Sequence, residues 1–96
     1  MRIVFIGAVA FSHSALERLV SMGADIVGVC TLKESKFNSD HVDLSHISAL
    51  HGIPWLYAED INSVESIDWI KRKAPDVIFC FGWSKLLKQE LLEMAP

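Results

Sequence analysis

Four short apolar runs alternate with stretches of helical periodicity along this chain. The runs are rich in β-branched and aromatic residues, which predicts strands at Arg2–Gly7, Asp25–Cys30, Pro54–Tyr57 and Asp76–Phe81. Apolar residues three and four positions apart predict helices between the strands and after the last one, over 15–22, 44–51, 62–74 and 85–94. This alternation is typical of parallel strands joined by crossover helices.

Capping and turn residues indicate where these helices should begin and end. Ser14, with Glu17 three positions later, forms the pattern of a capping box, and Asn62 occupies a cap position before the third helix. Gly23 and Gly52 follow the first and second helices, and glycine readily adopts the left-handed conformation that ends a helix.

The order of elements predicts an α/β fold with a doubly wound, Rossmann-like parallel sheet, of which this chain holds a part. In such sheets the first strand is central, the next two extend to one side, and the fourth returns to the other, which gives the order 3-2-1-4. Pro54 at the start of the third run favours an edge position for that strand. Ligands bind at the carboxyl ends of the strands where the order reverses. The expected site is therefore a crevice walled by Gly7–Ser12 and Gly82–Leu87.

Composition and charge fit one small globular domain over residues 1–96. Hydrophobic residues make up 51% of the chain and charged residues 22%, which excludes a disordered chain. The net charge is −3 and no basic stripe is visible, which argues against general polyphosphate binding. No apolar run approaches the roughly 20 residues of a membrane helix, so no membrane partner is expected. No secretory leader precedes the first strand, and a cytoplasmic location is expected.

Several kinds of chemistry are disfavoured at the crevice. A dinucleotide site needs three glycines after the first strand, but only Gly7 is present, and the side chains of Val9 and Phe11 obstruct a pyrophosphate. A nicotinamide-dependent oxidoreductase is therefore a minor alternative. The histidines are spread so that no metal site is expected, and no catalytic set can be assembled. Cys30 and Cys80 are expected to be buried free thiols, with a disulfide as the minor alternative.

The turn after the fourth strand carries the clearest sign of a ligand site. Gly82 lets the chain turn directly after a buried strand, and Trp83 then places a flat ring beside the crevice. Leu86 and Leu87 add apolar wall, which together suits a flat heteroaromatic ligand. The alternative is that these three side chains simply pack the last helix onto the sheet.

Several segments of the chain, in order and at matching spacing, resemble the amino-terminal domain of the formyltransferase family. The family acts on tRNA-bound methionine, glycinamide ribonucleotide or sugar amines. The resemblance covers nearly all of the chain and rests on the segments Arg2–Gly7, Phe11–Ser12, Ala15–Leu19, Pro75–Ile78 and Phe81–Leu87.

The resemblance implies transfer of a formyl group from 10-formyltetrahydrofolate to a primary amine, in an amino sugar or an aminoacyl-tRNA. Nucleic acid would be a partner only if the acceptor is initiator tRNA. The residues that match the family's folate site are Trp83, Ser84, Leu86 and Leu87. Those that match the side from which the acceptor approaches are Ala8, Val9, Ala10, Phe11 and Ser12.

The family's catalytic asparagine, histidine and aspartate have no counterpart in this chain. The resemblance places the first two on a strand expected to follow Pro96, so the 96-residue chain by itself is expected to be inactive. The alternative function is a non-enzymatic binding or assembly module that pairs through the open edge of Val77–Phe81. The polar stretch Thr31–Asp43 is the longest expected loop, and loops of this length tend to be functional or mobile.

Overall fold

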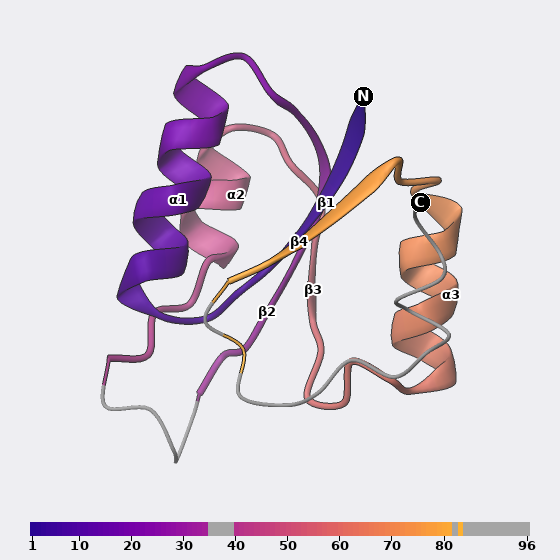
Figure 1. Ribbon diagram of the computed structural model, residues 1–96. Coiled ribbons are helices and arrows are strands. Elements are labelled where there is room, and N and C mark those ends of the chain that lie inside the picture. The colour runs from indigo at the N-terminus through magenta and orange to yellow at the C-terminus, as the bar shows by residue number, and fades with distance from the viewer. Residues whose placement is uncertain (35–39, 82, 84–96) are drawn as a thin grey trace.

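The computed structural model describes residues 1–34, 40–81 and 83, which form a parallel sheet between two layers of helices (Figure 1). The elements are, in chain order, β1 (Arg2–Ile6), α1 (Ala10–Ser21), β2 (Asp25–Thr31), α2 (Ser45–Leu50), β3 (Trp55–Tyr57), α3 (Val64–Arg72) and β4 (Val77–Cys80). The four strands are all parallel and lie in the order β3-β2-β1-β4. This confirms the predicted partial, doubly wound α/β fold and its strand order.

The central strand β1 is buried on both faces because helices cover both sides of the sheet. Ile3 and Phe5 belong to the core beneath α1 and α2, whereas Val4 and Ile6 belong to the core beneath α3. Figure 1 shows α1 and α2 on one side of the strands and α3 on the other. A strand covered on both faces needs apolar residues at every position, which explains the unbroken apolar run of β1.

A register irregularity between β1 and β2 makes room for the largest side chain of α3. The pairing shifts between Ile3 and Val4, where Val4 lies opposite Gly28. A Cβ atom on Gly28 would lie 2.8 Å from Cη2 of Trp69, so a larger residue would push the indole ring away. Gly28 thus lets α3 pack closely against the sheet.

The predicted start of the first helix was wrong. α1 begins at Ala10, four residues before the predicted cap at Ser14. The Ser12 hydroxyl accepts a hydrogen bond from the backbone N–H of Val9 at 3.3 Å, which provides an acceptor for one of the free amides at the helix start. The helix therefore starts directly after the β1 turn, and Ser14 lies inside it.

The predicted cap of the third helix was wrong by one residue, whereas both glycine stops were confirmed. Ser63, not Asn62, is the N-cap of α3, and its hydroxyl accepts a hydrogen bond from the backbone N–H of Ser66 at 3.2 Å. Gly23 and Gly52 have φ angles of 79° and 67°, which lie in the left-handed region.

The edge position of the third strand was confirmed, although the strand begins at Trp55 instead of Pro54. The prediction that both thiols are buried was half wrong. Both cysteines are free, and Cys30 is buried in the central part of the sheet, but Cys80 is exposed. The reason is position: Cys30 lies on β2 between β1 and β3, whereas Cys80 is the last residue of β4, which has a neighbour on one side only among the described strands. The predicted helix over 85–94 lies outside the described residues.

Candidate functional site

The strand order reverses between β1 and β4, and the predicted crevice would lie at the carboxyl ends of these two strands. These two strands are adjacent and parallel, and Ile6 of β1 lies opposite Cys80 of β4. Beyond this pair, the chain from β1 runs into α1 on one face of the sheet. The connection that leads into β4 comes from α3 on the other face (Figure 1). The sheet thus places its topological switch point where the sequence predicted it.

The wall formed by residues 8–12 presents two of its five side chains to solvent. Ala8, Val9 and Ser12 are buried, whereas Ala10 is exposed and Phe11 is 65% exposed. Part of the backbone of this wall already forms hydrogen bonds with the rest of the chain, because a short antiparallel bridge joins Val9 to His41. Direct side-chain contact with a ligand from this wall is therefore open to Ala10 and Phe11.

The same bridge anchors part of the long loop that was predicted over 31–43. The backbone N–H of Val42 donates to the carbonyl of Ala8 at 2.9 Å, and the N–H of Ala10 donates to the carbonyl of Asp40 at 3.0 Å. The imidazole Nε2 of His41 lies 2.7 Å from the carbonyl oxygen of Leu32. The described end of this loop is therefore pinned to the crevice wall.

Ser12 joins the two walls of the crevice. Its hydroxyl donates to the backbone carbonyl of Phe81 at 2.5 Å and also accepts from the N–H of Val9. Ser12 is fully buried, and its hydrogen bond with Val9 is buried whereas the one with Phe81 is partly buried. The turn after β1 and the end of β4 are thereby held together by one side chain.

Phe81 is a site residue that the sequence reasoning did not single out. Its ring contacts Phe5 and Phe79, with centroids 5.6 and 5.9 Å away, and meets the exposed ring of Phe11 edge-on at 5.8 Å. The sequence feature that could have identified Phe81 is its position directly before Gly82, at the end of an apolar strand. Phe81 connects the apolar core to the exposed aromatic ring at the crevice mouth.

Trp83 is half-buried and packs against the core on the α3 face. Its indole nitrogen Nε1 is buried, and it is the buried polar side-chain atom without a hydrogen-bond partner in the described part of the chain. A buried N–H donor of this kind is costly unless a ligand or water accepts from it. Gly82 and the other residues proposed for the folate site, Ser84, Leu86 and Leu87, lie outside the described residues.

A polar side chain close to the second helix has a shifted pKa. Burial by itself would raise the pKa of Asp43. Hydrogen bonds from the backbone N–H of Ser45 at 2.8 Å and from the hydroxyl groups of Tyr57 and Ser45, together with the charge of His46, lower this pKa below its usual range. Asp43 is therefore a charged anchor just before the start of α2.

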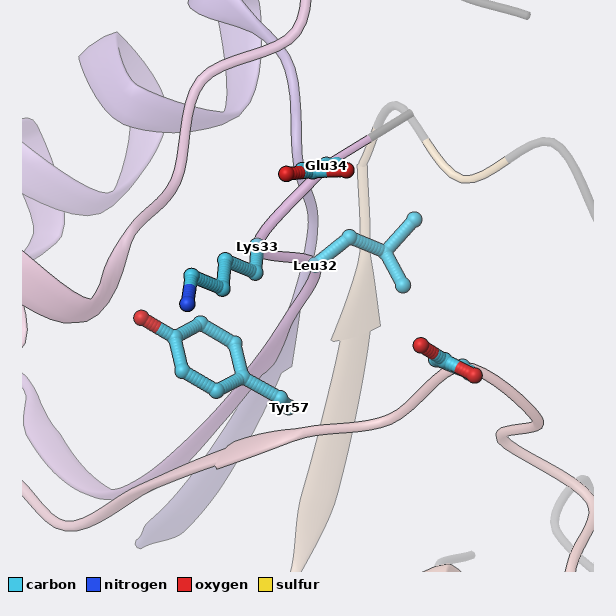
Figure 2. A pocket seen from close by; sticks show the side chains of 5 residues that line it. Leu32, Lys33, Glu34 and Tyr57 are labelled. Carbon is cyan, nitrogen blue, oxygen red and sulfur yellow. The ribbon is translucent and has the colours of Figure 1, made fainter. Parts of the chain in front are cut away.

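A second depression lies at the carboxyl ends of β2 and β3, next to the long loop (Figure 2). It has a volume of about 320 Å³ and is lined by Leu32, Lys33, Glu34, Tyr57 and Glu59. Figure 2 shows the Lys33 amino group and the Tyr57 hydroxyl ending on the same side of the depression. None of the predicted site residues lines it, so it is separate from the crevice between β1 and β4.

Sequence comparison relates nearly the whole chain to one group of enzymes. The chain is 31% identical to the methionyl-tRNA formyltransferase of Geobacter sulfurreducens, over 98% of this chain and 31% of that protein. It is 33% identical to the same enzyme of Bacillus pumilus, over 96% of this chain and 30% of that protein, and 29% identical to that of Thermotoga maritima, over 98% and 31%. These matches support the assignment of the chain as a fragment of a formyltransferase-family protein. It spans about a third of the length of these formyltransferases, and no protein-family model matches it.

Burial affects both cysteine thiols of the chain. Burial raises the pKa of the Cys30 thiol to about 12, and burial also raises the pKa of Cys80. Neither thiol is therefore activated as a nucleophile, since the reactive form is the thiolate. Within the described ranges, no cluster of three or more histidine, cysteine or acidic residues is arranged to hold a metal ion. No helix in the same part of the chain is long and apolar enough to cross a membrane.

Proposed function

We propose that this chain forms two walls of the active site of a formyltransferase that uses 10-formyltetrahydrofolate to formylate a primary amine. The observation that carries the proposal is that the sequence similarity and the strand topology point to the same part of the chain. The similarity to methionyl-tRNA formyltransferases runs over nearly the whole chain. In the sequence, the segments that the resemblance matches to the folate and acceptor sites follow β4 and β1, the two adjacent strands at the switch point.

The folate side of the proposal rests on the end of β4. The unpartnered indole N–H of Trp83 offers a donor to a ring system rich in acceptor atoms, and a pterin is such a ring system. The bound 10-formyltetrahydrofolate would supply the formyl group. We assign the remaining folate contacts to Ser84, Leu86 and Leu87 on the basis of the family resemblance.

The acceptor side of the proposal rests on the turn after β1. Phe11 and Ala10 would contact the acceptor directly, because they are the exposed residues of this wall. Ala8, Val9 and Ser12 would shape the wall from beneath. The names of the relatives favour tRNA-bound methionine as the acceptor, and an amino sugar is the second candidate.

The described residues supply binding walls rather than proton-transfer groups. The described residues of the two walls, which are 8–12, Phe81 and Trp83, include no acid, histidine, lysine or cysteine from which a catalytic base could be chosen. We therefore infer that the family's asparagine, histidine and aspartate act from elsewhere in the protein that carries this segment. The prediction that the 96-residue chain alone is inactive follows from this.

The test is an assay of the protein expressed from its complete reading frame. Purified protein would be incubated with 10-formyltetrahydrofolate and either methionyl initiator tRNA or a nucleotide-linked amino sugar, and mass spectrometry would detect the formylated amine. We expect formylation of one acceptor, with a Phe11→Ala variant raising KM for that acceptor. The matched control is Leu50→Ala, which removes another exposed apolar side chain far from the crevice. Absence of both folate binding and formyl transfer would refute the proposal.

A further inference from the structure

The two walls of the crevice have different surroundings, which raises the question of what keeps them at a fixed separation. The first wall leads into α1, on one face of the sheet. The second continues from β4, and Trp83 packs on the opposite face. Backbone pairing between β1 and β4 holds the strands themselves, but it stops where the two chains part.

Among the described residues, Phe81 is the last one of this segment to form a backbone hydrogen bond with β1. The N–H of Phe81 donates to the carbonyl of Ile6 at 2.9 Å, which continues the β1–β4 ladder. In a regular parallel ladder the next hydrogen bond would join the carbonyl of Phe81 to the N–H of Ala8. The carbonyl of Phe81 instead accepts from the Ser12 hydroxyl, which comes from the first turn of α1. A side chain thus extends the ladder by one hydrogen bond beyond the point where the chains diverge.

Gly7 provides the space for this hydrogen bond. A Cβ atom on Gly7 would lie 2.5 Å from the carbonyl oxygen of Phe81 and 2.6 Å from both Cβ and Oγ of Ser12. Every residue other than glycine would therefore separate the Ser12 hydroxyl from its acceptor. The glycine after β1 has a packing reason that is unrelated to nucleotide binding.

We propose that Ser12 is a positioning residue that sets the separation between the acceptor wall and the folate wall. This inference rests on the proposed function. The Ser12 hydroxyl contacts the Val9 N–H on one wall and the Phe81 carbonyl on the other, two residues before Trp83. The Ser12 side chain is fully buried, so shortening it leaves the buried N–H of Val9 and the partly buried carbonyl of Phe81 without this partner. We expect loss of the hydroxyl to loosen the turn after β1 and the end of β4 at the same time.

The test compares Ser12→Ala with Ser48→Ala in the protein expressed from its complete reading frame. Ser48 is the matched control, because it is equally buried and its hydroxyl also donates to a backbone carbonyl, that of Leu44, at 2.7 Å. Ser12→Ala loses two hydrogen bonds and Ser48→Ala loses one, so Ser12→Ala should lower thermal stability at least as much as Ser48→Ala does. We expect Ser12→Ala alone to raise the dissociation constant for tetrahydrofolate about tenfold, since one buried hydrogen bond contributes up to about that factor. Ser48→Ala should change it less than about twofold.

A second measurement does not depend on folate. Hydrogen exchange should accelerate in Ser12→Ala in the peptide that contains Val9 and also in the peptide that contains Phe81, with neither change in Ser48→Ala. If Ser12→Ala proves too unstable, Ser12→Cys keeps the size with a weaker donor, and intermediate effects are expected in both measurements.

The possible outcomes distinguish failure of the positioning role of Ser12 from failure of the proposed function. Faster exchange confined to the Val9 peptide, or equal effects of Ser12→Ala and Ser48→Ala on tetrahydrofolate binding, would overturn the positioning role. A wild-type protein that binds no tetrahydrofolate would overturn the proposed function. Exchange that accelerates in both peptides would still support the mechanical link.

Discussion

At the scale of single residues, hydroxyl side chains take over hydrogen bonding where the backbone pattern is interrupted. Ser12 does so at the end of the β1–β4 ladder. Thr31, the last residue of β2, is fully buried, and its Oγ1 accepts from the N–H of Leu44 at 3.1 Å, which fixes the approach to α2. Tyr57 donates to Asp43 at 2.8 Å and so connects β3 to the same approach. These short polar side chains satisfy backbone groups and charges that would otherwise be left without partners at the carboxyl edge of the sheet.

Asp43 should make stability depend on pH. Its folded pKa is lowered, so the charged carboxylate stabilises the fold above the unfolded pKa of about 3.9, and this contribution is lost as the pH falls through the folded pKa. Asp43→Asn keeps an acceptor for the N–H of Ser45 but removes the charge. Urea unfolding of the complete protein should show wild type more stable than the variant at neutral pH, with the difference shrinking below about pH 4. A difference that stays constant with pH would contradict this assignment.

At the scale of elements, α3 is held at both ends by groups from outside the helix. At its start, the Ser63 hydroxyl accepts from the N–H of Ser66. At its end, the guanidinium of Arg2 donates to the carbonyl of Lys73, with Nη2 at 2.6 Å, and Nε of Arg2 donates to the carbonyl of Ala74 at 3.2 Å. These contacts satisfy free amides and carbonyls that every helix end leaves exposed, and they join α3 to the beginning of β1.

The start of α3 provides a prediction at this scale. Ser63→Ala should lower the free energy of unfolding by about 1 kcal/mol, because the N-cap acceptor is lost. Ser63→Asp is the matched control: its carboxylate keeps an acceptor and favours the positive end of the helix, so stability should be close to that of wild type. Chemical denaturation followed by circular dichroism would measure both. Equal stability of Ser63→Ala and wild type would mean that another group caps the helix.

At the scale of the whole molecule, the two edges of the described sheet differ in kind. β3 forms one edge with only three residues, Trp55–Tyr57, and short edge strands offer little to a partner. β4 is outermost on the other side, and its apolar residues Val77–Phe79 are each partly buried. An apolar strand with an unpaired side can add a strand from another chain. This is the feature on which the alternative of an assembly module depends.

The edge of β4 predicts self-association of the 96-residue chain. At tens of micromolar, we expect light scattering to report a dimer or a larger species, because pairing along β4 would satisfy backbone groups and cover apolar side chains. The protein from the complete reading frame, measured at the same concentration, is the comparison. A monodisperse monomer of the 96-residue chain would show that β4 recruits no second copy.

The sequence by itself determined the order of elements, the parallel sheet, the strand order 3-2-1-4 and hence the switch point between β1 and β4. These follow from local information: β1 is apolar at successive positions because it is covered on both faces, and Gly23 and Gly52 end helices through their own backbone freedom. The topology then follows from the few connections that such elements allow. The motifs also carried the family resemblance, which sequence comparison bears out.

Tertiary structure alone decided where α1 begins, how the long loop is anchored and which residues join the two walls. Ser12 lies 69 residues from its partner Phe81, and no local pattern reveals that a helix residue will complete a strand ladder. Asp40 and Val42 pair with Ala10 and Ala8 in the turn after β1, although at least 30 residues separate the partners. Cys80 is exposed, although its apolar neighbours suggested burial, because its strand is outermost in the described sheet. Periodicity reports which face of an element is apolar, but only the assembled sheet decides which atoms meet there.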